Sequence, residues 1–515
     1  STPIKSSAAS DVYKRQTMFW HFAARVAAAA LSLPALLFAL RFFQQTGYNV
    51  ARGYIRIALS RCFVCGAICV ALLVPVEILL GDYSDAVLAG CSFASAAVAL
   101  SVRAKVLLKF TRRATRLFVV STVACTVGFL FLPSYLLPLL PFLVILPCAL
   151  LLLPFERSIN AKYIRQAEQK LSRAAYIKIA VTGSFGKTSV KNILTEMLSS
   201  KYKACCTPGS FNTPLGIASY VNNDLPCDAE AVVFEMGAKK RGDIDFLCKM
   251  VKPRYGILTG IEKQHLSTFG SVDNVIAAKG ELLKHIPENG ICVLNADNVY
   301  TRRLDVEACP TVTVGATGDV AIGDVSVSAA GTSFCLTVGG KKRTVKTRLL
   351  GAFNAINVAL AAALAYELGV DAEDIFGAAE RLKPVPHRLE LIEGANGTAI
   401  IDDSYNANIS GVRGALEVLS CFQGKRYVVT QGIVELGREQ FEVNFGLGKE
   451  LAAVSDAIVT LGQNCKALSQ GARAANASAE ILFADTVGEA ASLLAPRMRA
   501  GDVILFQNDL PDSMI

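Results

Sequence analysis

A glycine-rich turn with a lysine and a threonine stands between a short apolar run and a helical pattern. Residues 177–182 read IKIAVT, residues 183–189 read GSFGKTS, and VKNILTEMLSSKY follows. In such a turn, backbone N–H groups at the helix N-terminus face an anion, Lys187 neutralises the outer phosphates, and the Thr188 hydroxyl can ligate Mg²⁺. Val181 stands where the standard pattern has its first glycine. The turn predicts a nucleotide-phosphate site; the alternative is an ordinary strand–helix turn with a surface lysine.

Other candidate side chains follow apolar runs further along the chain. Glu235 ends AVVFE, which places its carboxylate at a sheet edge beside the phosphate loop, where it could hold a Mg²⁺ that Thr188 also touches. His265 follows YGILTGI, Lys279 lies in AAKGE, and SYNAN (404–408) follows TAIID. Each of these has an ordinary structural alternative when it is taken alone. Glu235 could be a surface glutamate, His265 a buried hydrogen-bonded histidine and Lys279 a solvated lysine. SYNAN could be a polar turn.

The segments around these residues alternate between β-rich and helical patterns. From 177 to 380 the alternation predicts βαβ units and a mainly parallel sheet. Residues 308–349 are short strands and Gly turns, which indicate a small antiparallel insert. Two prolines in KPVPHR (383–388) predict a hinge, and from 398 onward the alternation resumes in a smaller Rossmann-like domain.

The first third of the chain has a different composition. The 515 residues are 52% hydrophobic and 18% charged with a net charge of +9, which excludes intrinsic disorder and a disulfide-stapled secreted fold. Residues 1–170 contain 18 Lys/Arg and 6 Asp/Glu, whereas the remainder contains 34 and 37. Because the positive charge belongs to the apolar third, nucleic-acid binding loses its support.

Five apolar runs suggest membrane spans, at about 18–40, 62–80, 86–102, 117–133 and 138–155. Residues 1–17 are interpreted as a non-native leader and 156–174 as a linker. The basic segments 41–61 and 103–116 predict that they and everything after residue 156 face the cytoplasm of a multi-pass protein of the bacterial cytoplasmic membrane. Glu77, inside the second run, marks either a polar pathway or a helix end near the headgroups. The fifteen cysteines are expected to be free thiols, and Cys62 with Cys65 is a very weak metal site.

The predicted fold class is therefore α/β. N-terminal transmembrane helices precede a phosphate-loop-type, mostly parallel α/β domain with a small antiparallel insert, and a C-terminal Rossmann-like domain follows.

A succession of short motifs runs through the last two thirds of the chain. In order, they are GSFGKTS (183–189), GSFNTPLG (209–216), VVFEMGAKKRGDI (232–244), GILTGIEKQHLSTFGS (256–271), AAKGEL (277–282), LNADN (294–298), GAFNAINVALAAA (351–363), HRLE (387–390), IDDSYNAN (401–408) and GIVELG (432–437). This order closely resembles the Mur ligase family, the ATP-dependent amide ligases of peptidoglycan assembly. The resemblance covers roughly residues 175–515 and is strongest to the members that add D-alanyl-D-alanine. It implies a central ATP-binding domain at 175–383 and a C-terminal domain at 384–515.

The resemblance also implies roles for individual residues. The implied catalytic residues are Lys187, Glu235, His265, Lys279 and Arg388. The implied metal ligands, for two Mg²⁺, are Thr188, Glu235, His265 and Lys279, the lysine carbamylated by CO₂. The implied ATP contacts are Thr182, Gly183, Ser184, Gly186, Lys187, Thr188, Ser189, Asn295, Asp297, Asn357, Arg388 and Asp403, and the implied substrate contacts are Ser210, Asn212, Thr213, Ser404, Tyr405, Asn406 and Asn408.

The implied partners are ATP, a peptidoglycan precursor peptide, D-alanyl-D-alanine or a similar amine, and membrane lipid. Ile409 stands where the family commonly has proline, and GIVELG replaces GDMLELG, so amine specificity stays open. Two alternatives also stay open: a ligase that acts on a lipid-linked or polymeric acid, and a non-catalytic membrane scaffold switched by nucleotide. The relative that amidates lipid II carries a four-Cys zinc insert, and no CxxC pair occurs here after residue 170.

Overall fold

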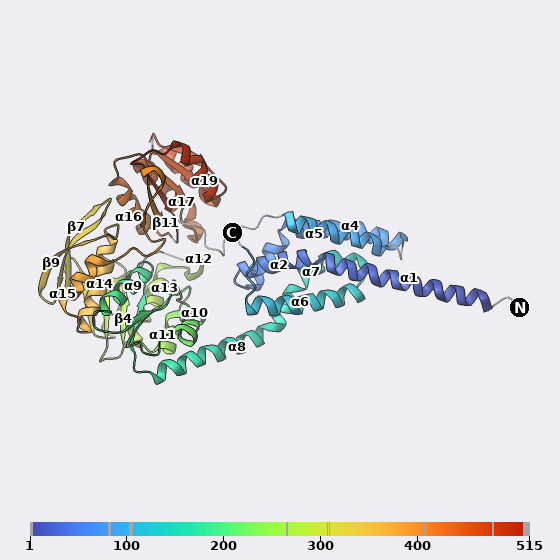
Figure 1. Cartoon of the computed structure of the whole chain (residues 1–515), viewed down its shortest axis with the longest axis horizontal. Coiled ribbons are helices and arrows are strands. Elements are labelled where there is room, and N and C mark those ends of the chain that lie inside the picture. Colours follow the sequence, from blue (N-terminus) through green and yellow to red (C-terminus); the bar gives the residue numbers. More distant parts are fainter. Residues whose placement is uncertain are drawn as a thin grey trace. The chain divides into compact units, whose positions relative to one another are not determined.

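The computed structural model describes residues 4–80, 84–101, 107–263, 266–305, 307, 309–405, 407–475 and 478–507. The described chain separates into an N-terminal unit, up to Ala161, and a second unit that begins at Lys162 (Figure 1). The division falls inside one long helix, α8 (Ile145–Arg173).

The N-terminal unit is helical. Its helices are α1 (Ile4–Leu31), α2 (Leu33–Gln45), α3 (Val50–Ala58), α4 (Arg61–Leu80), α5 (Ser84–Ser101), α6 (Arg112–Phe131), α7 (Leu140–Leu143) and the first part of α8. Helix α1 runs without a break through residues 4–17, the segment interpreted as a leader, because Ala, Lys, Arg and Gln there are good helix formers. The six cysteines of this unit are free thiols in the structure.

Four charged side chains of this unit have hydrogen-bond partners within it. Arg116 donates two hydrogen bonds to the buried Glu156, at 2.6 and 2.8 Å. The Glu77 carboxylate accepts from the backbone N–H of Tyr135 at 3.0 Å. Arg25 donates to the backbone carbonyl of Leu132 at 3.0 Å. These contacts give the charged residues of the apolar runs a structural role at helix ends.

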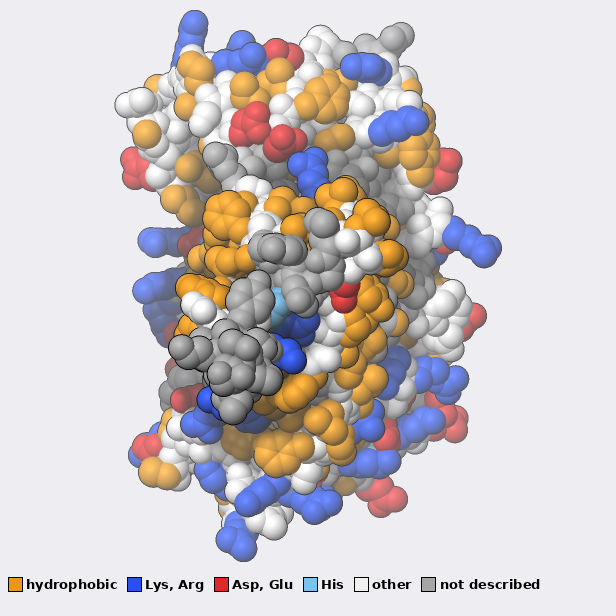
Figure 2. All heavy atoms as spheres, turned by 90° about the vertical axis from the view of Figure 1, so that its right-hand side faces the viewer, with side chains coloured by type: hydrophobic (Ala, Val, Ile, Leu, Met, Phe, Trp, Pro, Cys, Tyr) orange, Lys and Arg blue, Asp and Glu red, His pale blue; other side chains and the backbone are white. Residues whose placement is uncertain are grey.

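Fewer helices than the five predicted spans have the length and composition to cross a membrane. Among the described residues, 14–45, 61–79 and 112–131 qualify, and a bent pair formed by 134–143 and 145–173 could count as a fourth. The apolar helix at 87–101 is too short for the test. Many large apolar side chains of this unit are nevertheless exposed, Phe19 and Trp20 among them, and hydrophobic side chains gather on the face shown in Figure 2.

The second unit contains two lobes, each built on a sheet. The first lobe, residues 162–382, has nine strands in the order β2-β3-β1-β4-β5-β6-β7-β8-β9. Strands β2 (Ala204–Cys206), β3 (Ala231–Glu235), β1 (Ile177–Thr182), β4 (Tyr255–Leu258), β5 (Ile291–Asn295) and β6 (Thr311–Gly315) are parallel. The buried, β-branched runs of β1 and β3 are typical of a parallel sheet covered on both faces.

Helices pack on both faces of this sheet. On one face lie α9 (Lys187–Leu198), α14 (Phe353–Glu367) and α15 (Ala372–Arg381), and on the other lie α11 (Asp243–Val251), α13 (Val272–Gly280) and the end of α8. Short helices α10 (Pro214–Ser219) and α12 (Leu266–Phe269) connect these elements. The predicted mainly parallel sheet is confirmed.

The predicted antiparallel segment is present, but it is not a separate insert. β7 (Val320–Ser328), β8 (Gly331–Val338) and β9 (Lys341–Thr347) pair antiparallel with one another, and β7 continues the main sheet by pairing parallel with β6. Phe334, Leu336 and Val345 join the core beneath α14. These strands extend the sheet because their inward faces share its core.

The second lobe, residues 390–507, has six strands in the order β10-β11-β15-β12-β13-β14. β10 (Glu390–Glu393) is antiparallel to β11 (Ala399–Asp403); β15 (Val503–Gln507), β12 (Arg426–Thr430), β13 (Ala457–Thr460) and β14 (Glu480–Phe483) are parallel. Its helices are α16 (Ile409–Ser420), α17 (Gln440–Val454), α18 (Cys465–Ala474) and α19 (Val487–Leu494). The resumed alternation predicted from 398 onward is present, with strands in the runs TAIID, RYVVT, DAIVT and DVILF.

The segment that joins the two lobes begins where α15 ends, and we count it with the second lobe. It has two residues with left-handed backbone, His387 (φ 62°) and Leu389 (φ 52°), on either side of Arg388. The His387 ring nitrogen Nδ1 lies 2.7 Å from the Asp402 carboxylate. Left-handed backbone is costly for residues with a Cβ, so this connection has a defined, strained geometry that aims Arg388.

Candidate active site

A cavity of about 480 Å³ lies at the carboxyl ends of β1 and β3 and is lined by both lobes. This is the edge at which ligands bind in open parallel sheets. It brings together most of the predicted site residues: Gly183, Ser184, Gly186, Lys187, Thr188, Ser189, Ser210, Asn212, Thr213, Glu235, Lys279, Asn357, Arg388, Asp403, Tyr405 and Asn408.

The phosphate loop is shaped by two glycines with positive φ. Gly183 has φ 150° and Gly186 has φ 74°, the latter at the N-cap of α9. A Cβ added at Gly186 would come 2.6 Å from Asn357 Oδ1. Lys187 Nζ donates to the carbonyl oxygens of Gly183 and Ser184 at 2.9 and 3.1 Å. The loop therefore holds its lysine at the start of α9, where backbone N–H groups also point.

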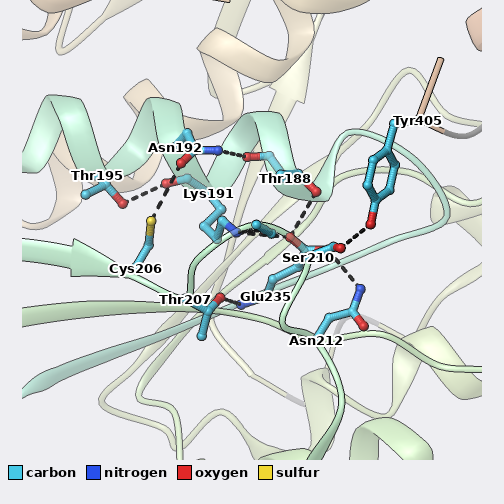
Figure 3. Close-up of polar contacts among 11 residues, drawn as sticks. Thr188, Lys191, Asn192, Thr195, Cys206, Thr207, Ser210, Asn212, Glu235 and Tyr405 are labelled. Atoms are coloured by element: carbon cyan, nitrogen blue, oxygen red, sulfur yellow. Dashed lines mark hydrogen bonds and ion pairs between the residues drawn. The ribbon is translucent and has the colours of Figure 1, made fainter. Parts of the chain in front are cut away.

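Glu235 is the centre of the polar network beside this loop. Its carboxylate accepts from Thr188 Oγ1 at 2.9 Å, from Asn212 Nδ2 at 3.0 Å and from Lys191 Nζ at 3.3 Å, as Figure 3 shows. Strand register produces this placement, because Glu235 pairs with Val181, just before the loop. Lys191 was not among the predicted residues; the signal for it was its position one helical turn after Lys187.

Burial and neighbouring charges shift the pKa values of the ionisable side chains in this network. Burial alone would raise the pKa of Glu235, but Lys187 and Lys191 outweigh it, and the pKa lies below its ordinary value. Burial lowers the pKa of Lys187 to about 8, with Glu235 opposing the shift and Arg388 adding to it. A carboxylate thus stays ionised at the base of a cavity that also holds an easily neutralised amine.

Lys279 lines the same cavity from α13. Its side chain is buried, and it has no hydrogen bond or ion pair within the part of the chain that the structure describes. Burial, with Lys187 adding to it, places the pKa of Lys279 well below its ordinary value. The surroundings of Lys279 therefore favour the neutral form of its amine, which is the nucleophilic form.

The oxygen donors fit a hard divalent cation. Thr188 Oγ1 and a Glu235 oxygen lie 2.9 Å apart at the cavity wall, and hydroxyl and carboxylate oxygens are the ligands that Mg²⁺ prefers. Within the described ranges, no three His, Cys, Asp or Glu side chains gather as a metal cluster. The predicted ligand His265 lies outside the described residues, as does the predicted substrate contact Asn406.

The second lobe contributes a cation, an acid and a phenol. The Arg388 guanidinium lies 4.1 Å from the centre of the Tyr405 ring, a cation–π contact. Burial raises the pKa of Asp403 to about 7, although Arg388 opposes the shift. Tyr405 Oη hydrogen-bonds Ser210 Oγ of the first lobe. Residues from the two lobes therefore already touch across the cavity.

Four other predicted site residues make hydrogen bonds within the protein around the site. Asn295 Nδ2 donates to the Thr259 carbonyl at 2.9 Å, and Asp297 accepts from the Ala316 N–H. Thr182 Oγ1 donates to the Met236 carbonyl at 3.0 Å. Ser404 Oγ donates to Asp402 at 2.6 Å. None of these four is among the residues that line the cavity. Two residues that do line it, Thr213 and Asn408, also accept from backbone N–H groups as the N-caps of α10 and α16.

Comparison with known proteins matches both lobes. Residues 181–365 match the Mur ligase middle domain, and residues 387–507 match the Mur ligase, glutamate ligase domain. The UDP-N-acetylmuramoyl-tripeptide–D-alanyl-D-alanine ligase of Escherichia coli is 32% identical over 300 residues, 56% of this chain and 66% of that enzyme. The enzyme of that name from Mycobacterium bovis is 30% identical over 356 residues, 64% of this chain and 69% of that enzyme.

A solved structure gives the same result. The MurF ligase of Thermotoga maritima, determined in complex with ADP, has 30% identity and a TM-score of 0.59, and the match covers 68% of this chain and 80% of that one. The chain thus spans just under two thirds of the Escherichia coli relative, and each match leaves about a third or more of this chain uncovered.

The prediction of a multi-pass protein of the bacterial cytoplasmic membrane is contradicted. The matched ligases are soluble cytoplasmic enzymes, and the apolar N-terminal helices are candidates by length and composition only. Burial inside the protein accounts for part of this apolar composition, since 44% of the apolar window in residues 14–45 is buried. A membrane-lipid partner is likewise unsupported.

Proposed function

We propose, from the premise that the chain belongs to the Mur ligase family, that it is an ADP-forming ligase joining D-alanyl-D-alanine to the peptide carboxylate of UDP-N-acetylmuramoyl-tripeptide. One observation supports this above the others: a cavity that holds the phosphate loop, Glu235 and Lys279 of one lobe together with Arg388 and Tyr405 of the other. A cavity shared in this way suits a reaction that must bring a phosphate donor, an acid and an amine together.

The first step activates the acid. A carboxylate oxygen of the peptide attacks the γ-phosphorus of ATP, and the bond between that phosphorus and the β,γ-bridging oxygen breaks, giving an acyl phosphate and ADP. Phosphoryl transfer depends mainly on positioning and charge neutralisation. Lys187, at the phosphate loop, and Arg388, from the second lobe, are the two cations that would neutralise the transferred group.

ATP binds along the loop from Gly183 to Ser189, with Asn357 behind Gly186 and Asp403 in the second lobe. Mg²⁺ is a cofactor of the Mur ligases. Thr188 and Glu235 would hold one ion, which neutralises charge on the phosphates when bound. We assign a second ion to Lys279 and His265, with Lys279 carbamylated. Carbamylation forms a bond between a neutral Nζ and CO₂ and releases one proton, and the depressed pKa of Lys279 favours it.

The second step forms the amide. The amine attacks the acyl carbon, phosphate leaves with the electrons of the C–O bond, and the amine loses one proton. We assign the substrates to Ser210, Asn212, Thr213, Tyr405 and Asn408, which line the cavity from both lobes, and propose that Ser404 and Asn406 act with them. Contact between the lobes keeps water from the acyl phosphate. We also propose that the hinge at 383–388 divides the central from the C-terminal domain.

The test is a reaction of purified protein with ATP, Mg²⁺, UDP-linked tripeptide and D-alanyl-D-alanine. We expect one ADP and one phosphate for each amide formed, and a rate about 10²- to 10³-fold lower in the Lys187→Ala variant, because one charge-assisted contact to the transition state is lost. Nucleotide binding without amide product would contradict the ligase and favour the nucleotide-switched scaffold.

A further inference from the structure

Glu262 connects the phosphate loop to the second lobe through its backbone and side chain. It follows β4 at the carboxyl edge of the first sheet. Its backbone N–H donates to Ser184 Oγ at 3.1 Å, and Ser184 Oγ donates to the Glu262 carbonyl at 3.3 Å. The backbone of Glu262 is thus fixed to a residue of the phosphate loop.

The Glu262 side chain reaches helix α16 of the second lobe. Its Oε1 accepts from Ser410 Oγ at 2.7 Å and from the Ser410 backbone N–H at 3.1 Å. The other oxygen, Oε2, is buried and has no hydrogen-bond partner among the described residues. The burial that raises the pKa of this carboxyl is only partly offset by the bonds from Ser410 and by Arg413.

Ser410 is the second residue of α16, so its N–H is one of those that a helix leaves unpaired at its start. Asn408, the N-cap, satisfies the Gly411 N–H at 2.7 Å. The Ser410 N–H is satisfied by Glu262 from the other lobe, where a negative charge also suits the helix dipole. Helix α16 is therefore capped partly by its own lobe and partly by the lobe that holds the phosphate loop.

We propose that Glu262 is a positioning residue that caps α16 across the boundary between the lobes and so holds Tyr405 and Asn408, which precede the helix, beside the phosphate loop. Its effect on amide formation rests on the proposed function. Glu262 does not line the cavity and touches no reacting atom. It acts through Ser184 on one side and Ser410 on the other.

A neighbouring contact between the lobes provides a matched control. Lys263 Nζ lies 3.4 Å from Glu439, and these side chains are 44% and 50% exposed. Exposed ion pairs contribute little, because solvent screens them and two long side chains must be ordered. Lys263→Ala also removes a contact between the lobes, one residue from Glu262, and should leave every measurement below nearly unchanged.

The experiment compares Glu262→Ala, Glu262→Gln, Ser410→Ala, the Glu262→Ala/Ser410→Ala pair and Lys263→Ala by hydrogen exchange and kinetics. In Glu262→Ala, we expect backbone N–H groups at 409–412 to exchange about 10- to 100-fold faster, the range for losing hydrogen bonds to a charged group. kcat/KM for the amine should fall by a similar factor, with the Kd for ATP within about twofold of wild type.

Glu262→Gln should restore most of both losses, since its amide oxygen can accept the same two hydrogen bonds without the charge. Ser410→Ala should cause a smaller loss and no further loss in the Glu262→Ala background. Unchanged exchange at 409–412 in Glu262→Ala, or full additivity of the two substitutions, would overturn the proposal. Absence of amide from the wild-type protein would contradict the proposed function instead, and hydrogen exchange would still decide whether Glu262 caps α16.

Discussion

At the residue scale, the site is a group of buried ionisable side chains, and the pKa of each depends on the charges of the others. Lys187 and Lys191 keep the Glu235 carboxylate ionised in spite of its burial. The same burial brings the pKa of Lys187 to about 8 and that of Asp403 to about 7. Two groups of the cavity therefore titrate near physiological pH, and an anion that binds there should shift the pKa of both.

Affinity for ATP should fall as pH rises above about 8. Because burial lowers the pKa of Lys187, its amine is charged below pH 8 and neutral above it, and only the charged form attracts phosphate. Calorimetric titration between pH 7 and 9.5 should show Kd rising by up to about tenfold per pH unit above 8. Lys187→Arg, which stays protonated, should show no such slope; an equal slope in both proteins would contradict the assignment.

Lys279→Ala should abolish amide formation, and short carboxylates such as formate or acetate should partly restore it. The carbamate that we assign to Lys279 provides oxygen ligands, and a small acid can occupy the space left by the removed side chain. The measurement is the rate of ADP release against carboxylate concentration, with chloride as the ionic-strength control. Normal turnover of Lys279→Ala at saturating Mg²⁺ would show that the lysine is not needed.

At the scale of elements, the phosphate loop works because a glycine begins α9. Gly186→Ala should destabilise the protein by about 2 kcal/mol, because the residue has φ 74° and the added Cβ would lie 2.6 Å from Asn357 Oδ1. Gly446→Ala, inside α17 where a Cβ meets nothing within 4 Å, should instead stabilise by about 0.5–1 kcal/mol. Urea unfolding measures both, and equal effects would contradict this account of the loop.

The helices and strands of the second unit could largely be predicted from the sequence, because their patterns depend on residues that are close together in the chain. The runs IKIAVT and AVVFE are short, apolar and bounded by turn residues, and each is a parallel strand. Residues at the ends of such strands meet at one edge, which is why Lys187 and Glu235 could be assigned together. The pairing of β7 with β6 could not be predicted, because the register between sheet neighbours is not local information.

Contacts between segments far apart in the chain also could not be predicted from sequence patterns. Glu262 and Ser410 are 148 positions apart, and neither stands in a pattern that indicates the other. The Asn295 side chain donates to the Thr259 carbonyl, a contact that its motif does not indicate. A short polar residue after a strand can suit a ligand, a neighbouring backbone group or both, and the sequence pattern does not distinguish these cases.

At the scale of the whole molecule, α8 belongs to both units. Its last turns pack Ala167 and Leu171 into the core of the first lobe, with Tyr163 and Ile164 partly buried beside them. Lys170 Nζ also donates to the Asn222 carbonyl at 2.7 Å. The catalytic unit therefore begins inside this helix, ahead of the boundary at 175 suggested by the motifs.

A chain that begins at residue 162 should fold and bind ATP, whereas one that begins at 175 should be less stable by about 3–5 kcal/mol. The shorter chain loses the apolar contacts of Ala167 and Leu171 and exposes the core beneath them. Urea unfolding of the two chains measures the difference. Equal stability would mean that the end of α8 contributes nothing to the catalytic unit.

The central claim, ligation through an acyl phosphate, has one direct measurement. UDP-linked tripeptide labelled with ¹⁸O in the reacting carboxylate is converted with ATP, Mg²⁺ and D-alanyl-D-alanine, and the released phosphate is analysed by mass spectrometry. The account predicts one ¹⁸O in each phosphate, because the attacking carboxylate oxygen leaves with the phosphoryl group. Amide formed with unlabelled phosphate would contradict the mechanism.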